Sequence, residues 1–196
     1  MNAFVLGFSL ALLAIVCLAQ LLTPDWRWRL GYLSAIYLLA FVLITASWPL
    51  ELAAVKLVSG WMATAVLGLT QLNKPESEES DADDFPQSPL FLSMAAGLVI
   101  VLASGAAPAM VAWARQFDAG VVWGGLFLIG TGLLHVGLSS NVFNNGLGLL
   151  ILLAGFEVVY AGVETSILVA GLLALLTLGI SLVSAFLMQA GSGERV

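Results

Sequence analysis

The chain has 196 residues, of which 61% are hydrophobic and only 9% are charged, and its mean hydropathy is +1.05. This composition excludes a soluble globular domain and is typical of an integral membrane protein. Half of the twelve acidic residues lie in the single segment 73–88, so the net charge of −6 describes that segment rather than a charged binding surface. Basic residues are not clustered, and no nucleic-acid partner is expected.

The apolar runs are long enough for helices that cross a bilayer, and they do not alternate as the strands of a membrane barrel do. We therefore expect an all-α, polytopic membrane protein with about seven transmembrane helices. The first run lacks a basic segment and a clear cleavage site, so we interpret it as a retained span rather than a signal peptide. The expected spans are about 3–22, 30–48, 50–72, 89–107, 119–138, 143–164 and 165–189.

Two features stand out in the first span and at the start of the second. The only cysteine, Cys17, lies in the first apolar run, which excludes a disulfide and predicts a buried, inert thiol rather than a metal ligand or a reactive group. The segment 26–29, with two tryptophans and two arginines, is typical of a membrane interface.

The third expected span contains a lysine, Lys56, on the same helix face as Gly60, Thr64 and Gly68. Small residues at this spacing favour contact with another helix, so Lys56 is expected to point towards protein. One alternative is that its long side chain reaches back to the interface, about 10 Å away at the Pro49 end, or simply pairs two helices. The other is a role in a proton path.

The polar segment 73–88 predicts a flexible linker between two membrane halves, because it has acids, serines and prolines but no apolar periodicity. The expected organisation is a three-helix half at 1–72, an acidic linker at 73–88, and a four-helix half at 89–196. In the second half, Pro108 either ends or kinks the fourth span, and residues 110–118 are expected at the interface.

Polar residues in the last three spans are candidates for proton transfer. Glu157 lies about 5 Å from the midpoint of the expected helix 143–164, where an ionised carboxylate must be paired or face a polar interior. His135 is either a neutral, hydrogen-bonded histidine near a helix end or a relay group. Thr177, Ser181 and Ser184 share one face of the last span, where their hydroxyls either support a water chain or bond to their own helix.

Glycines recur every seven residues beside Glu157, at Gly148, Gly155 and Gly162. Together with the small residues beside Lys56, they predict two ridges suited to close helix contact. We expect that the seven short-looped helices cannot cover both ridges, which would imply a partner protein.

The distribution of cations predicts an orientation. Arg27, Arg29, Lys74 and Arg195 fall on one side of the membrane and Arg115 on the other. The positive-inside rule then places the N-terminus outside and the C-terminus in the cytoplasm, in a cell inner or plasma membrane.

The segment 149–161, with Gly155-Phe156-Glu157 at its core, resembles the second helix of subunit K of bacterial complex I and of the related small subunit of multi-subunit cation/proton antiporters. The wider layout is similar to hydrogenase-4 component E. The similarity lies in residues 29–32, which open one span, in Glu51, which begins the next, and in a subunit-K-like half after a polar linker. The resemblance covers about residues 28–72 and 119–190.

The resemblance implies a small membrane-arm subunit of a complex-I-like, hydrogenase-like or cation/proton antiporter assembly, with larger antiporter-like partners and no cofactor of its own. Glu157 falls on the position of the family's proton-handling glutamate. Two departures are evident: the region of the family's second glutamate holds Thr177, Gly179 and Ser181, and the family's lysine would match Thr64 rather than Lys56. A shortened relay, or one completed by a partner, is implied.

Two functions remain open from the sequence. The first is a proton relay that uses Glu157, Lys56, His135, Thr177 and Ser181. The second is a structural, scaffolding subunit in which Glu157 only bonds a neighbouring helix. A stand-alone transporter is disfavoured because no inverted repeat is evident. No nucleophile, metal cluster, phosphate loop or small-molecule site is evident either, so any enzyme activity would belong to the oxidoreductase complex around it.

Overall fold

The structure is a computed structural model that describes residues 3–73, 88–113 and 118–193. These residues form seven helices, each long and apolar enough to cross a membrane, and they include no strand. The helices are α1 (Ala3–Leu22), α2 (Trp26–Ile44), α3 (Leu50–Leu72), α4 (Pro89–Trp113), α5 (Ala119–Leu138), α6 (Val142–Tyr160) and α7 (Ile167–Gly193). The predicted all-α, multi-pass fold is confirmed.

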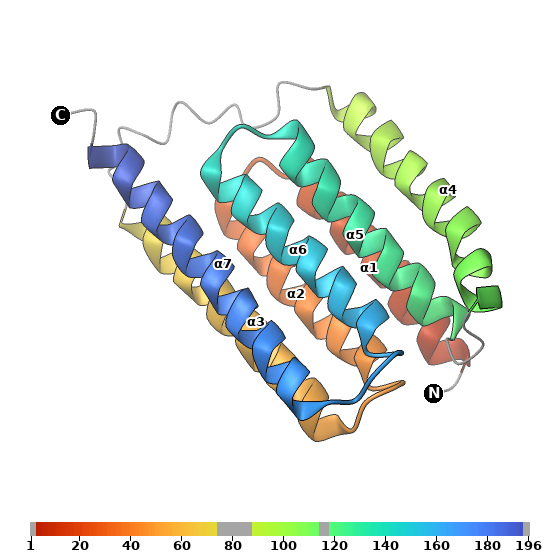
Figure 1. Cartoon of the computed structure of the whole chain (residues 1–196). Coiled ribbons are helices and arrows are strands. Elements are labelled where there is room, and N and C mark those ends of the chain that lie inside the picture. The colour runs from red at the N-terminus through yellow and green to blue at the C-terminus, as the bar shows by residue number, and fades with distance from the viewer. Residues whose placement is uncertain (1–2, 74–87, 114–117, 194–196) are drawn as a thin grey trace.

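The helices pack in two layers (Figure 1). In one layer α2 lies between α1 and α3, and in the other the order is α4, α5, α6, α7. Across the layers α1 packs on α5, α2 on α6 and α3 on α7, and the helices of each pair run in the same direction. We call the two ends of the bundle the Arg29 end, where α1 meets α2, and the Trp48 end, where α2 meets α3.

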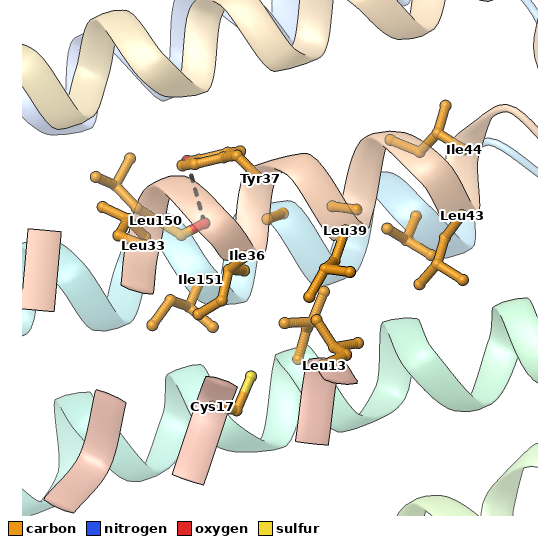
Figure 2. Packing of buried hydrophobic residues seen from close by; sticks show 14 of the residues in the cluster. Leu13, Cys17, Leu33, Ile36, Tyr37, Leu39, Leu43, Ile44, Leu150 and Ile151 are labelled. Atoms are coloured by element: carbon orange, nitrogen blue, oxygen red, sulfur yellow. Dashed lines mark hydrogen bonds between the residues drawn. The ribbon is translucent and has the colours of Figure 1, made fainter. Parts of the chain in front are cut away.

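The buried apolar core lies between the layers. Leu13 of α1, Ile36 of α2 and Ile151 of α6 belong to this one buried cluster, part of which Figure 2 shows. Cys17 is buried in the same core, as the sequence predicts for an inert thiol. Because lipid tails are as apolar as these side chains, tight van der Waals packing and hydrogen bonds must hold the layers together.

The most extensive helix contact is between α5 and α6, where glycines of the two helices face each other. A Cβ atom built on Gly155 would lie 2.6 Å from the carbonyl oxygen of Gly125, and one built on Gly148 would lie 2.9 Å from that of Gly132. Only glycine allows two backbones to approach so closely. The α6 ridge is therefore covered within the chain by α5, and Gly162 lies in the turn after α6.

The α3 ridge is also covered within the chain. A Cβ atom on Gly60 would clash with the ring of Tyr37, and one on Gly68 would lie 3.2 Å from Leu30, so α2 occupies this face. The prediction that one ridge is left over for a partner is therefore wrong. Each ridge packs on the helix that precedes it in the chain, the α3 ridge on α2 and the α6 ridge on α5. The seven helices therefore cover both ridges.

Several helix boundaries differ from those expected. Helix α2 begins at Trp26 and ends at Ile44, so the interface-like segment 26–29 is its first turn. Helix α6 ends at Tyr160, four residues earlier than expected, in a turn that includes Gly162. Helix α4 continues through Pro108 to Trp113, since membrane helices tolerate a proline where neighbouring groups compensate for the lost hydrogen bond. The predicted linker, apart from Asn73 and Ser88, and residues 114–117 lie outside the described residues.

Candidate functional site

The two charged residues singled out in the sequence form an ion pair. The Nζ atom of Lys56, on α3, donates a hydrogen bond to Oε1 of Glu157, on α6, over 2.6 Å. Their side chains are only 3% and 4% exposed. The pair therefore joins the two layers of the bundle, and it neutralises two charges that would each be costly inside a membrane.

A third helix contributes a hydroxyl to this site. The Oγ1 atom of Thr177, on α7, lies 3.4 Å from Glu157 Oε1 and donates a shorter hydrogen bond of 2.9 Å to the carbonyl oxygen of Leu173 in its own helix. The hydroxyl can therefore turn between its own backbone and the carboxylate. Lys56, Glu157 and Thr177 come from α3, α6 and α7, and the structure brings these three predicted site residues together.

Tyr37 of α2 borders the pair and was not predicted as a site residue. Its ring covers Gly60, one turn along α3 from Lys56, and its hydroxyl lies 3.5 Å from the carbonyl oxygen of Leu150 in α6 (Figure 2). It is also close enough to Glu157 for an electrostatic interaction. The signal in the sequence was a tyrosine near the middle of a span, away from the interfaces where tyrosine is common.

Glu157 does not lie near the centre of α6, where the sequence led us to expect it. Because α6 ends at Tyr160, Glu157 is in its last turn, about 4.5 Å from the helix end. At the same end, the indole Nε1 of buried Trp48 donates a 2.9 Å hydrogen bond to the carbonyl oxygen of Glu164. This bond joins the α2–α3 turn to the α6–α7 turn. The ion pair is thus near the Trp48 end, in a part of the bundle that these turns close.

Thr177, Ser181 and Ser184 lie along the buried side of α7. The hydroxyl groups of Thr177 and Ser181 donate hydrogen bonds to backbone carbonyls of their own helix. Ser181 is fully buried and donates to the carbonyl oxygen of Leu178 over 3.0 Å, and Thr177 bonds back in the same way. Ser184 packs against Gly146 of α6, where a Cβ atom would lie 2.6 Å from its Oγ. Of the two alternatives, bonding to their own helix is what the structure shows for Thr177 and Ser181.

His135 is buried in the last turn of α5, away from the ion pair. Its Nδ1 atom lies 3.1 Å from the carbonyl oxygen of Thr131, one turn earlier in the same helix. Helix α5 runs towards the Arg29 end, whereas the ion pair lies towards the Trp48 end. The structure therefore does not place His135 with the other predicted relay residues.

Arg29 is a second polar residue whose position differs from the expected one. It was assigned to a membrane interface, yet it is only 3% exposed. Its Nε atom donates to the carbonyl oxygen of Thr23 over 2.6 Å, and Nη1 donates to Oδ1 of Asn144, in α6, over 2.5 Å. The sequence does contain a signal for this burial: Arg29 is four residues before Leu33, so the two residues share the buried face of α2. Arg27 is exposed instead and lies over the Trp26 ring.

The described residues include no group of three or more histidine, cysteine or acidic side chains that could hold a metal ion. Comparisons with protein-family models, curated proteins and solved structures found no match to this sequence. The function of the candidate site is therefore inferred from its geometry alone. A lysine and a carboxylate are in direct contact within a largely apolar bundle.

Proposed function

We propose that this chain is a multi-pass membrane subunit that contributes the Lys56–Glu157 pair to proton translocation by a larger assembly. The observation that carries the proposal is the direct, buried contact of 2.6 Å between an ammonium group and a carboxylate inside the membrane region. Ionisable residues inside membrane spans are costly to keep, and they commonly mark ion or proton pathways.

The pair suits proton transfer because two arrangements of one proton are both electrically neutral overall. When the proton moves from Nζ of Lys56 to Oε1 of Glu157, an N–H bond breaks and an O–H bond forms, and an amine faces a carboxylic acid. Neither state leaves a net charge in the apolar interior, so the large cost of an isolated buried charge is avoided. The Thr177 hydroxyl, 3.4 Å from the carboxylate, can donate to the ionised form.

A single pair near one end of the bundle cannot carry a proton across the whole bilayer. Among the described residues, the other buried side chains that can bear a charge at neutral pH are Arg29 and His135, and both lie nearer the Arg29 end. We therefore propose partners: larger antiporter-like subunits of a complex-I-like, hydrogenase-like or cation/proton antiporter assembly, which complete the path. In this proposal the chain has no active site or cofactor of its own.

The proposed location is a cell inner or plasma membrane, with the N-terminus outside and the C-terminus in the cytoplasm. Exposed Arg27 at the Arg29 end supports this orientation through the positive-inside rule. Buried Arg29 no longer counts as an interfacial cation, and Lys74, Arg115 and Arg195 lie outside the described residues. The Trp48 end, with the ion pair, would then face the outside.

The substitution Glu157→Gln tests the proposal. Glutamine keeps the shape and the hydrogen-bonding capacity of a protonated glutamate, but it cannot release a proton near neutral pH. The assembly, purified in mild detergent and reconstituted in vesicles, should form normally while proton transport is lost, and Glu157→Asp should retain part of it. The matched control is Glu164→Gln, an exposed glutamate after the end of α6. Undiminished transport by an assembled Glu157→Gln complex would disprove the proposal.

The alternative is a structural subunit, and the same ion pair favours it in one respect. The pair joins α3 of one layer to α6 of the other, so it can serve simply to hold the layers together. In that case the double variant Lys56→Met/Glu157→Met, which replaces both charges by apolar groups, should assemble and leave transport by the complex unchanged. If the pair transfers protons, the same double variant should instead abolish proton transport by the complex.

A further inference from the structure

A second buried polar cluster lies at the Arg29 end of the bundle. We define it by its members Gln20 of α1, Arg29 of α2, His135 of α5 and Asn144 of α6, which are at most 3% exposed. Arg29 donates to Asn144 Oδ1, and His135 interacts with the backbone of Gln20 and electrostatically with Arg29. Helices of both layers thus meet in this second polar group, inside a bundle whose core is largely apolar.

This cluster has polar atoms that no protein group satisfies. Both atoms of the Gln20 side-chain amide, Oε1 and Nε2, are buried without a hydrogen-bond partner, and so is Nδ2 of Asn144. Gln20 itself is 0% exposed. A buried polar group left without a partner is destabilising, and buried polar atoms in native proteins are nearly always satisfied by protein or by ordered water.

We propose that the Arg29-end cluster is a binding site for one or more internal water molecules, held by the Gln20 amide and Asn144 Nδ2. The chemistry of the unsatisfied atoms selects this ligand. Nε2 and Nδ2 need acceptors, whereas Oε1 needs a donor, and a water molecule both donates and accepts. An anion would satisfy the two amino groups but not Oε1. A cation would satisfy only Oε1 and would be repelled by Arg29. Exchanging the nitrogen and oxygen of the Gln20 amide leaves this argument unchanged, because both atoms are unpartnered.

The water site is separate from the Lys56–Glu157 pair. Asn144 and Glu157 are 13 residues apart in α6 (157 − 144), so they are separated by about 20 Å along the helix. The site therefore hydrates the opposite end of the bundle and places water beside His135 without involving the ion pair. It does not depend on the proposed proton translocation.

A high-resolution structure of the full chain in a lipid nanodisc tests this inference. We expect a peak the size of a water molecule within about 2.7–3.2 Å of both the Gln20 amide and Asn144 Nδ2. A Gln20 amide bonded directly to protein, with no such peak, would overturn the inference, as would a peak with the size and contacts of an ion.

Hydroxyl-radical labelling by X-ray radiolysis gives a second readout in the same nanodiscs. Radicals form from bound water, so His135, at 0% exposed, should be labelled above Phe127, which is 2% exposed and packs on Trp123 in the apolar core. The variant Gln20→Met keeps the side-chain length and removes both hydrogen-bonding atoms, and it should lower the labelling of His135 severalfold. Labelling of His135 no higher than that of Phe127 in the unmodified chain would contradict the proposal, whether or not the variant folds.

Discussion

Gly132 of α5 and Gly148 of α6 face each other so closely that a Cβ atom on Gly132 would lie 2.7 Å from the carbonyl oxygen of Gly148. The same atom would lie 2.5 Å from the backbone nitrogen of Leu152. Backbone atoms cannot move aside as a flexible side chain can, so any side chain at this position must push the two helices apart. The α5–α6 contact is the most extensive in the bundle, and α6 carries Glu157.

We therefore predict that Gly132→Ala destabilises the protein by about 1–3 kcal/mol, the usual cost of overpacking a tight interior. The matched control is Gly137→Ala in the same helix, where nothing lies within 4 Å of the added methyl group. Thermal unfolding in mild detergent should show a lower midpoint for the first variant and an unchanged or slightly higher one for the second. Equal midpoints would show that the helices separate at no cost.

A second prediction concerns the ion pair. Lys56→Met leaves the Glu157 carboxylate buried without its cation, and breaking a buried pair in this way costs about 3–5 kcal/mol. Adding Glu157→Leu to the same chain removes the remaining charge and should recover most of the lost stability. Unfolding free energies of the single and double variants, measured in the same detergent, check this. A double variant no more stable than Lys56→Met would contradict a direct energetic link between the two residues.

A third prediction separates the two arginines at the start of α2. Arg29→Gln removes the hydrogen bonds to Thr23 and Asn144, and bonds from charged groups contribute about 1.5–3 kcal/mol, so a loss of this order is expected. Arg27→Gln, at an exposed position two residues away, should change stability by no more than about 0.5 kcal/mol. If the two variants unfold at the same temperature, Arg29 does not hold α2 to α6.

The fourth prediction concerns the closed Trp48 end. Trp48→Phe keeps a large aromatic ring but removes the indole N–H that binds the carbonyl oxygen of Glu164. A loss of about 0.5–1.5 kcal/mol is expected for one hydrogen bond, and hydrogen exchange should increase in the α6–α7 turn. Trp28→Phe, at a position that is 62% exposed, is the control and should leave exchange in this turn unchanged. Equal exchange in both variants would show that the bond does not tie the two turns together.

The fold class followed from the sequence because span length and apolar composition are dictated by the bilayer itself. The bounds of α1, α3 and α5 were predicted to the residue, since each ends where the apolar run ends. The end of α6 was not, because the residues after Tyr160 are still apolar enough to continue a span. Only the turn at 161–163 ends the helix there, and hydropathy does not reveal it.

The candidate site could be predicted in part. Lys56 and Glu157 were found separately, because a charge inside an apolar run is conspicuous, but their contact depends on how α3 lies relative to α6. Helix spacing shows which residues share a face and not which helix covers that face. For the same reason one of the two ridges was expected to be left over for a partner, although α2 and α5 cover them both. Arg29 was misplaced because arginine is common at interfaces, and its partner Asn144 lies 115 residues later.

The separation of Lys56 and Glu157 along the chain also matters for biosynthesis. Glu157 is made 101 residues after Lys56, which takes about 5–20 s at about 5–20 residues per second. During this delay α3 enters the membrane with a cation whose partner does not yet exist. Lys56 is in the second turn of α3, about 10 Å from the Pro49 end, so its long side chain can reach the aqueous interface until α6 arrives. The first layer of the bundle therefore lacks its packing partners, and Lys56 lacks its counter-ion, until α6 and α7 are inserted.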